Sequence, residues 1–330
     1  MAVVTSRKEI EPIFEEFRSR GACMAVFCTA SCWNTEAILL AAKRFGEKHN
    51  ISRPVVSVAT TFNYPFMPQC QRVTYSGNAR TGFISIMEHL NVLAASEDAP
   101  YSNVIVLPHL DHADPKLDNW ALTEGVDYLA TVMFDAQKYP PEENLRMTME
   151  YVHAYADRVM IEGIVEQLSV EGRAKGAVQH DQDAGAARDD YVDRATDFME
   201  RTGVDFLVAD LGTEQQSVRV GEAQYLKDRA RALTEALGTA RLVLHGTSCL
   251  SPEQMDGLAE DGIIRVNTWT RIVREAGQFA ADEVVGNIGS IRSGEFEFAD
   301  PGAFIRNATD KAALVMEELM EIMGYARFAA

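Results

Sequence analysis

The chain has 330 residues, a formal net charge of −18, and 47% hydrophobic residues. This apolar fraction can build a sizeable core, so composition excludes a disordered chain and favours one large globular domain. The acidic balance argues against a nucleic-acid partner, because tracking phosphates requires clustered Lys and Arg. No apolar run reaches the roughly 18 residues of a membrane span. The polar N-terminus does not resemble a signal peptide, and five cysteines in so long a chain predict free thiols and a cytoplasmic location.

Short apolar runs rich in β-branched residues alternate with longer segments of helical character. The predicted strands cover residues 22–28, 54–62, 103–110, 128–135, 158–165, 205–211, 241–245 and 263–267. Apolar residues at helical spacing predict a helix over 35–47, and the Pro140–Pro141 pair opens another that continues to 156. Ser251 and Pro252 have the residue types of a helix start, and Gly324 ends a last helix at about 301–323.

Strand–helix alternation favours a parallel sheet covered by helices, and eight repeats match a closed (β/α)₈ TIM barrel. An open doubly wound sheet is the alternative, although no GxGxxG motif follows the first strand. We therefore expect one barrel domain over residues 1–330. The stretch at about 169–190, rich in Gly, Ala, Gln and Asp, predicts a mobile loop of the kind that often covers an active site.

Functional residues of such a barrel lie at the C-terminal ends of its strands. The third predicted strand ends in His109–Leu110–Asp111–His112. An imidazole can bind zinc, and a neighbouring carboxylate can move a proton. The alternative is a buried histidine with satisfied hydrogen bonds and an aspartate that caps the next helix.

The seventh predicted strand ends in His245–Gly246–Thr247–Ser248, which offers a metal ligand beside a turn whose N–H groups can bind an anion. Gly, Thr and Ser are also common in ordinary turns. The eighth ends in Asn267 and Thr270, which can hold sugar hydroxyls or a phosphate. None of the eight strands ends in a lysine, which argues against a Schiff-base mechanism.

With these segments in this order, residues 21–327 resemble the class II, metal-dependent ketose-bisphosphate aldolases. The segments that carry the resemblance are 109–112, 140–144, 202–205, 244–248 and 266–270. The resemblance implies that His112 and His245 bind Zn²⁺ or another divalent metal, with Asp111 beside it as acid and base. It also implies substrate contacts from five residues, Asn267, Ser248, Thr270, Gly246 and Arg219.

The chain departs from this family at four positions. The family's third zinc ligand is a histidine after the sixth strand, where Gln215 stands here, and Gln216 replaces the glycine that follows it. Ile164 replaces the second acid of a Glu-x-Glu motif, and Cys249 replaces a glycine. We predict Gln215 as the third metal ligand. Glu214 or a residue of the 169–190 loop, such as His180, Asp181 or Asp183, could take that place instead, or the metal could be absent.

The resulting hypothesis is a metal-dependent aldolase-type lyase. It cleaves or forms a C–C bond in a ketose, expected to be phosphorylated, through a metal-stabilised enediolate. A ketose epimerase or isomerase on the same barrel is one alternative, and a non-catalytic ligand-binding paralogue is another. The expected partner is a small sugar or sugar phosphate, with no nucleic acid and no membrane. The resemblance implies a homodimer or homotetramer.

Overall fold

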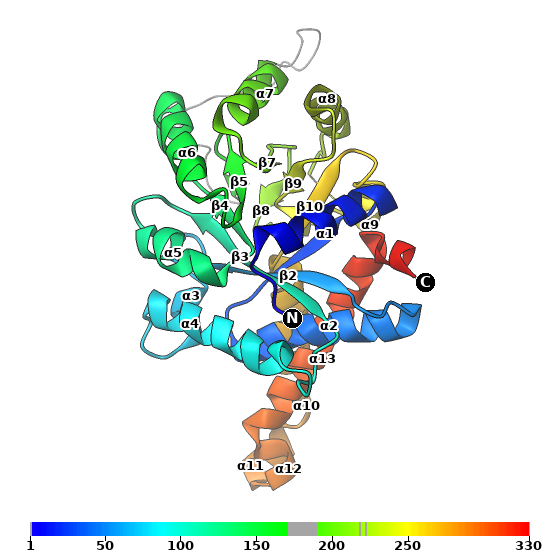
Figure 1. The fold of residues 1–330 in the computed structure, drawn as a ribbon. Helices are drawn as coiled ribbons and strands as arrows, with labels where there is room; N and C mark the ends of the chain where they lie inside the picture. Colours follow the sequence, from blue (N-terminus) through cyan, green and yellow to red (C-terminus); the bar gives the residue numbers. More distant parts are fainter. Residues whose placement is uncertain (1, 171–189, 218, 222, 330) are drawn as a thin grey trace.

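A computed structural model describes residues 2–170, 190–217, 219–221 and 223–329. Within these ranges, eight parallel strands close into a barrel in the order β1-β10-β9-β7-β5-β4-β3-β2 (Figure 1), so the predicted TIM barrel is confirmed. The barrel strands are β1 (Met24–Cys28), β2 (Val55–Thr61), β3 (Ile105–Ala113), β4 (Thr131–Phe134), β5 (Met160–Ile164), β7 (Phe206–Val208), β9 (Leu242–Leu244) and β10 (Ile263–Thr268). A separate parallel pair joins β6 (Ser169–Val170) to β8 (Glu214–Gln215).

Each of the eight predicted apolar runs overlaps one barrel strand. The difference that matters for the site is in β3, which continues to Ala113 where the sequence predicts an end at 110. Pairing with β2 carries it through Thr61↔Asp111, and pairing with β4 resumes at Ala113↔Phe134. The chemically important residues of this segment therefore lie inside the strand, between its paired residues, where the pairing with β4 is interrupted.

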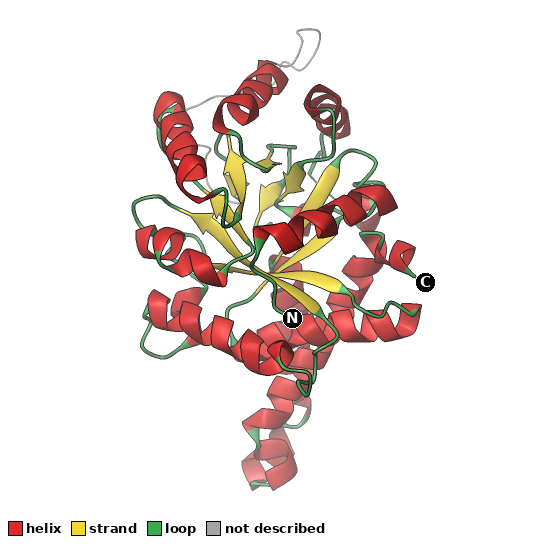
Figure 2. Cartoon of the chain, in the orientation of Figure 1, coloured by secondary structure: helices red, strands yellow, loops and turns green. Residues whose placement is uncertain are grey.

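Helices surround the barrel (Figure 2). The longer ones are α1 (Arg7–Arg20), α2 (Cys32–His49), α4 (Ala79–Leu90), α6 (Pro141–Tyr155), α7 (Asp190–Thr202), α8 (Lys227–Leu237), α10 (Thr270–Gly286) and α13 (Pro301–Ile322). The short ones are α3 (Cys70–Val73), η1 (Asn91–Ala95), α5 (Asn119–Thr123), η2 (Gly125–Tyr128), η3 (Thr247–Cys249), α9 (Pro252–Met255), α11 (Ile288–Ser293), α12 (Phe296–Ala299) and η4 (Tyr325–Phe328).

Two predicted helix starts are observed, at Pro141 in α6 and at Pro252 in α9. Ser251 caps α9 in a capping box with Gln254, but α9 is only one turn long. The predicted loop at 169–190 falls mostly on residues outside the described ranges; Ser169–Val170 form β6 and Asp190 begins α7. No helix in the described part of the chain is long and apolar enough to cross a membrane.

The N-terminal end of the barrel is closed by α1, which lies across the strands (Figure 1). The ring of Phe14 packs on Phe206, the first residue of β7, with centroids 4.6 Å apart. Both side chains are fully buried, together with the guanidinium of Arg265. Because this end is filled with side chains, a ligand can approach the barrel axis from the C-terminal end.

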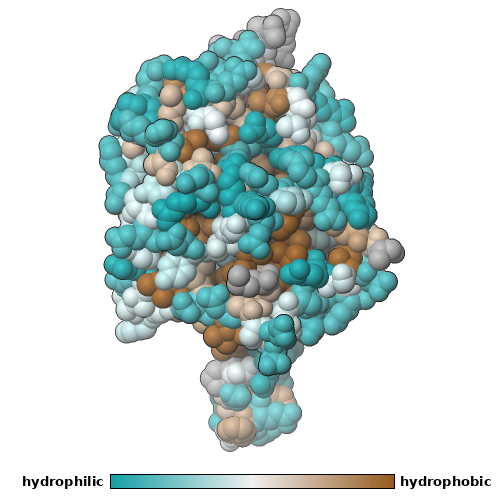
Figure 3. Space-filling view, viewed as in Figure 1, coloured by the Kyte–Doolittle hydropathy of each residue, from teal (hydrophilic) through white to brown (hydrophobic). Residues whose placement is uncertain are grey.

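The helices α10, α11, α12 and α13 form an extension that projects from the barrel (Figure 1). The inner part of α13 packs on α2, where Met316 and Met320 are buried. The part of this extension that lies away from the barrel exposes large apolar side chains, and Figure 3 shows hydrophobic residues among the hydrophilic ones there. These exposed residues are Phe279, Val285, Ile288, Phe296 and Ile305.

Candidate metal centre and substrate pocket

A pocket lies at the C-terminal ends of the barrel strands, with an empty volume of about 490 Å³ that is partly open to solvent. Its lining comes from β1, β2, β3 and β10, from the residues after β9, and from β8. Residues from four barrel strands, from the end of a fifth and from β8, separated by up to about 240 positions in the sequence, thus meet in one cavity, as expected for a barrel. No lysine or arginine belongs to the lining contributed by the described residues.

Two consecutive residues of β3, Asp111 and His112, both line this pocket. In a regular strand, consecutive side chains point to opposite faces. The β3–β4 register shifts between Leu110 and Ala113, and His112 has a φ of 48° in the left-handed region. This bulge turns both side chains toward the cavity, a common use of bulges beside functional sites. The backbone therefore accepts local strain to place the carboxylate next to the imidazole.

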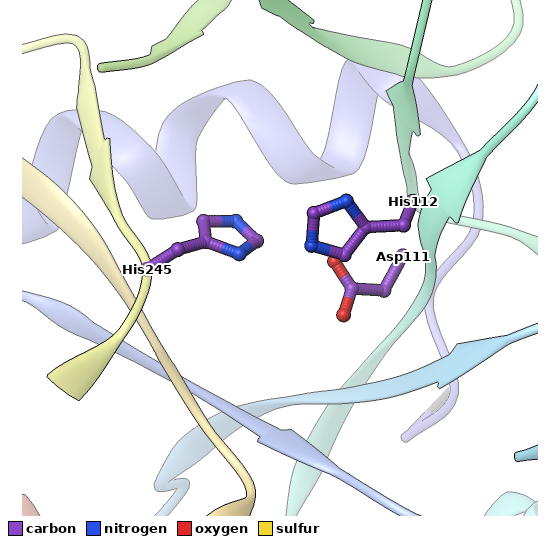
Figure 4. A group of neighbouring side chains, drawn as sticks. All are labelled: Asp111, His112 and His245. Atoms are coloured by element: carbon purple, nitrogen blue, oxygen red, sulfur yellow. The ribbon is translucent and has the colours of Figure 1, made fainter. Parts of the chain in front are cut away.

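His245, directly after β9, completes a group of three buried residues with Asp111 and His112. One potential ligand atom from each lies within 4.8 Å of the others. The imidazole rings of His112 and His245 point toward one another with centroids 5.0 Å apart, and Asp111 lies beside His112 (Figure 4). The two histidines are 133 positions apart in the chain, and the structure brings them together as the sequence predicts.

The orientation of His112 is fixed by its neighbours. Its Nδ1 donates a hydrogen bond to Oδ2 of Asp135, which follows β4, at 2.7 Å, and the Tyr64 ring stacks on the imidazole at 4.2 Å and 9°. Burial lowers the pKa of His112, but the carboxylates of Asp111 and Asp135 outweigh it and the pKa is raised. With Nδ1 occupied, Nε2 is the nitrogen left to bind a metal, and such a carboxylate partner is typical of metal-binding histidines.

Asn267 of β10 lies between Asp111 and His245 and contacts both side chains. Its Nδ2 donates to Oδ1 of Asp111 at 3.0 Å and lies 3.3 Å from Nε2 of His245, while Cys28 Sγ donates to its Oδ1 at 3.2 Å. Burial raises the pKa of Asp111, which makes its carboxylate a stronger base. Burial and the neighbouring His112 lower the pKa of His245, so this imidazole stays neutral with a lone pair for a metal.

Beneath the pocket lies a buried polar layer. His109, the other histidine of the β3 motif, does not line the cavity; its Nδ1 is 2.8 Å from Oγ1 of Thr131. Glu162 of β5 and Arg265 of β10 form an ion pair with Oε1 and Nε 2.9 Å apart. Burial raises the pKa of Glu162 to about 7, although Arg265 opposes the rise. Of the two β3 histidines, only His112 is placed for metal binding.

The predicted substrate residues Gly246, Ser248 and Thr270 line the pocket, with Thr270 at the start of α10. Ser248 Oγ is buried without a hydrogen-bond partner. Gly246 has a φ of 70°, and a Cβ there would lie 2.9 Å from the backbone of Glu214, so this turn requires glycine. Cys249 donates its Sγ–H to the Gly246 carbonyl at 2.9 Å and does not line the pocket.

Gln215 also lines the pocket, and the Tyr64 hydroxyl donates to its Oε1 at 3.3 Å. Arg219 and Glu214 pair with each other, with Nη2 and Oε2 3.3 Å apart, and neither belongs to the lining. His180 and the other loop candidates lie outside the described residues. Tyr64 is not predicted from the sequence, because nothing in the loop after β2 marks a residue that stacks on a histidine 48 positions away.

A closed barrel with two imidazoles, a carboxylate and an amide at its C-terminal end has the architecture of a metal-binding barrel enzyme. The model of the family described as "Fructose-bisphosphate aldolase class-II" matches residues 9–327, and the chain belongs to this family. It is accordingly a carbon–carbon lyase of the aldolase type, as the resemblance implies.

Relatives with aldolase names cover much of the chain. It is 27% identical over 242 residues to a fructose-bisphosphate aldolase of Streptococcus pneumoniae, which covers 71% of this chain and 76% of the relative. It is 32% identical over 180 residues to a 6-phospho-5-dehydro-2-deoxy-D-gluconate aldolase of Shouchella clausii, covering 53% and 56%. The crystal structure of a Campylobacter jejuni fructose-bisphosphate aldolase shares the fold, with a TM-score of 0.75 at 17% identity over 98% and 95% of the two chains.

Proposed function

We propose that the chain is a divalent-metal-dependent aldolase that cleaves or forms a C–C bond in a phosphorylated ketose, through an enediolate whose charge the metal stabilises. The observation that carries this proposal is the buried group of Asp111, His112 and His245, whose potential ligand atoms lie within 4.8 Å of one another in the pocket. The two curated relatives are named for different substrates, so the proposal stops at the class of ketose phosphates.

The donor set fits a divalent cation. His112 offers Nε2 because Asp135 holds its Nδ1, and His245 is kept neutral by burial. Two imidazoles beside a carboxylate are ligands that zinc takes readily, so zinc is the proposed metal. When bound there, a divalent cation supplies Lewis acidity that polarises a carbonyl and stabilises negative charge on oxygen.

Asp111 is the proposed acid and base. In the cleavage direction its carboxylate accepts the proton of the substrate hydroxyl, the C–C bond breaks, and that carbon becomes the carbonyl of the departing aldehyde. In the synthetic direction the same carboxyl returns the proton. Asn267 holds Oδ1 of Asp111 at 3.0 Å, whereas Oδ2 has only a long contact with Cys28 Sγ at 3.8 Å, so Oδ2 is the proposed site of the proton. The raised pKa of Asp111 suits a group that must both accept and return it.

The opposite end of the substrate is proposed to meet the turn after β9 and the start of α10. Gly246, Ser248 and Thr270 line the pocket there. The backbone N–H groups of helix starts favour anions, which supports a phosphate at this end. Arg219 stays a predicted phosphate ligand, and its present partner is Glu214.

Aldehyde release from a panel of ketose phosphates, measured with a coupled dehydrogenase, tests this function. We expect turnover that a chelator abolishes and that zinc, cobalt or manganese restores. The matched control is chelator-treated protein without added metal. Conversion of the ketose to an epimer or isomer without aldehyde release would favour the isomerase alternative. Metal-loaded protein that converts none of the ketoses would favour the non-catalytic paralogue.

Self-association belongs to the same proposal, as a homodimer or homotetramer. The projecting helices expose Phe279, Val285, Ile288 and Phe296, and exposed apolar groups of this kind often mark contacts between proteins. Sedimentation equilibrium of the full chain distinguishes these assemblies from a monomer.

A further inference from the structure

The pocket contains an orphan hydrogen-bond donor. Gln215 Nε2 is buried and has no hydrogen-bond partner, although the side chain lines the cavity. A buried N–H without an acceptor is costly, and in a pocket it is most simply explained by an acceptor that the ligand supplies.

One hydrogen bond orients the carboxamide, and its donor and the backbone beneath are themselves anchored. The Tyr64 hydroxyl donates to Gln215 Oε1 at 3.3 Å. The Tyr64 ring is itself anchored on the His112 imidazole, at 4.2 Å and nearly parallel. The backbone of β8 pairs with β6, and Gly246 packs directly on the backbone of Glu214. The Tyr64 hydroxyl is the one of these contacts that touches the carboxamide, and it engages the oxygen, so the NH₂ group keeps its hydrogen-bonding capacity.

An amide side chain can bind a metal through its oxygen or donate a hydrogen bond to a substrate through its NH₂ group. A metal cation binds the carbonyl oxygen, because the amide nitrogen carries two N–H donors and offers no free lone pair. In this arrangement the oxygen accepts from Tyr64, and the NH₂ group of this pocket-lining side chain has no hydrogen-bond partner among the described residues. The orientation therefore opposes metal ligation and favours recognition of a substrate oxygen.

We propose that Gln215 is a substrate-recognition residue rather than the third metal ligand, and that Tyr64 is the positioning residue that orients it. This inference rests on the proposed aldolase function and specifies one contact within it. Gln215 Nε2 donates to a hydroxyl or carbonyl oxygen of the ketose. A neutral donor thus occupies the place that an imidazole ligand holds in the family that the chain resembles, so the change alters substrate recognition more than metal affinity.

The test compares Gln215→Leu and Tyr64→Phe with the unsubstituted protein. Tyr64→Phe removes the hydroxyl and keeps the ring on His112. Tyr139→Phe is the matched control, because its hydroxyl also donates at 3.3 Å, to Asp114 Oδ1, but outside the pocket. The measurements are metal stoichiometry and affinity by chelator competition, and binding of dihydroxyacetone phosphate to the zinc-loaded protein by calorimetry, with KM and kcat for the best ketose phosphate.

We expect metal affinity to stay within about 2-fold in both variants. Gln215→Leu should raise the dissociation constant and KM by about 10-fold, and Tyr64→Phe by about 3-fold, as expected for the loss or weakening of one hydrogen bond. The control should match the unsubstituted protein. Circular dichroism of both variants checks that they are folded.

Two results would overturn the inference alone while the parent protein binds metal and turns over ketose. One is a 10-fold or larger loss of metal affinity in Gln215→Leu, which would show the reverse orientation, with the amide oxygen on the metal. The other is unchanged substrate binding and KM in that variant. Failure of the unsubstituted, metal-loaded protein to bind or convert any ketose would instead overturn the proposed function, and this assignment with it.

Discussion

Replacing Arg265 by methionine tests whether its buried positive charge stabilises the ionised carboxylate of Glu162 beneath the site. The guanidinium is fully buried, lies 2.9 Å from the Glu162 carboxylate, donates to Ser57 Oγ at 3.2 Å and lies over the rings of Phe14 and Phe206. Methionine fills part of the volume and removes the charge. The carboxylate of Glu162 is then buried without its ion-pair partner, which is costly unless it takes up a proton.

The pKa values determine how this cost depends on pH. Burial raises the pKa of Glu162 to about 7 from its usual 4.5 even with Arg265 in place, so the native protein binds this proton more tightly than the unfolded chain. The free energy of unfolding therefore falls as the pH rises between the two pKa values, from about 4.5 to about 7, and it levels off above the folded pKa. Without Arg265 the pKa rises further and the fall continues above pH 7. Above pH 7 the variant should lose stability relative to the parent by up to about 1.4 kcal/mol per pH unit, the value for one proton, until the pH reaches the raised pKa.

Urea denaturation of metal-free protein at pH 6, 7, 8 and 9, followed by tryptophan fluorescence, measures this difference. At pH 6 the variant should lose only the packing and hydrogen bonding of Arg265. The double variant Arg265→Met with Glu162→Gln removes the titrating group, so its difference from Glu162→Gln should not change with pH. A destabilisation by Arg265→Met that is equal at pH 6 and pH 9 would refute the reasoning.

Three further variants test the site. Asp111→Asn should lower kcat by about 10²–10⁴-fold with the thermal melting temperature little changed, because it removes the acid–base group; a loss below 10-fold would exclude that role. Asp135→Asn should weaken zinc binding by about 10–100-fold in chelator competition, because it disturbs the hydrogen bond to His112; unchanged affinity would contradict the orientation argument. Gly246→Ala should destabilise the protein by about 1–3 kcal/mol in chemical denaturation, because of its φ of 70° and the contact with Glu214, and a neutral effect would show that the turn adapts.

The barrel could be predicted from the sequence because each strand is a short apolar run bounded by polar turn residues, and the helices between them repeat at helical spacing. Of the projecting helices, α13 was predicted as the helix at about 301–323, whereas α10, α11 and α12 were not. Thr270–Gly286 and Ile288–Ser293 bury few side chains, with Ile272 and Ala276 the buried residues of α10, so they lack a continuous apolar face. A pattern based on burial cannot identify helices that extend away from the core.

The candidate site was predicted in part. His112, His245 and Asn267 stand at strand ends, where barrel topology makes convergence predictable. The hydrogen-bond partner of His112 could not be predicted, because its contact with Asp135 depends on the β3 bulge and on the left-handed conformation of His112. The role of Gln215 depends on Tyr64, whose stacking is a tertiary contact without a local sequence pattern.

The central claim concerns where a metal ion binds. Anomalous X-ray scattering from crystals of the zinc-loaded protein, collected on both sides of the zinc absorption edge, locates the ion directly. The account predicts one peak per chain within about 2.0–2.3 Å of a nitrogen of His112 and a nitrogen of His245, and no such peak in the His112→Ala, His245→Ala double variant. A peak elsewhere, or none at full zinc occupancy in solution, would contradict it.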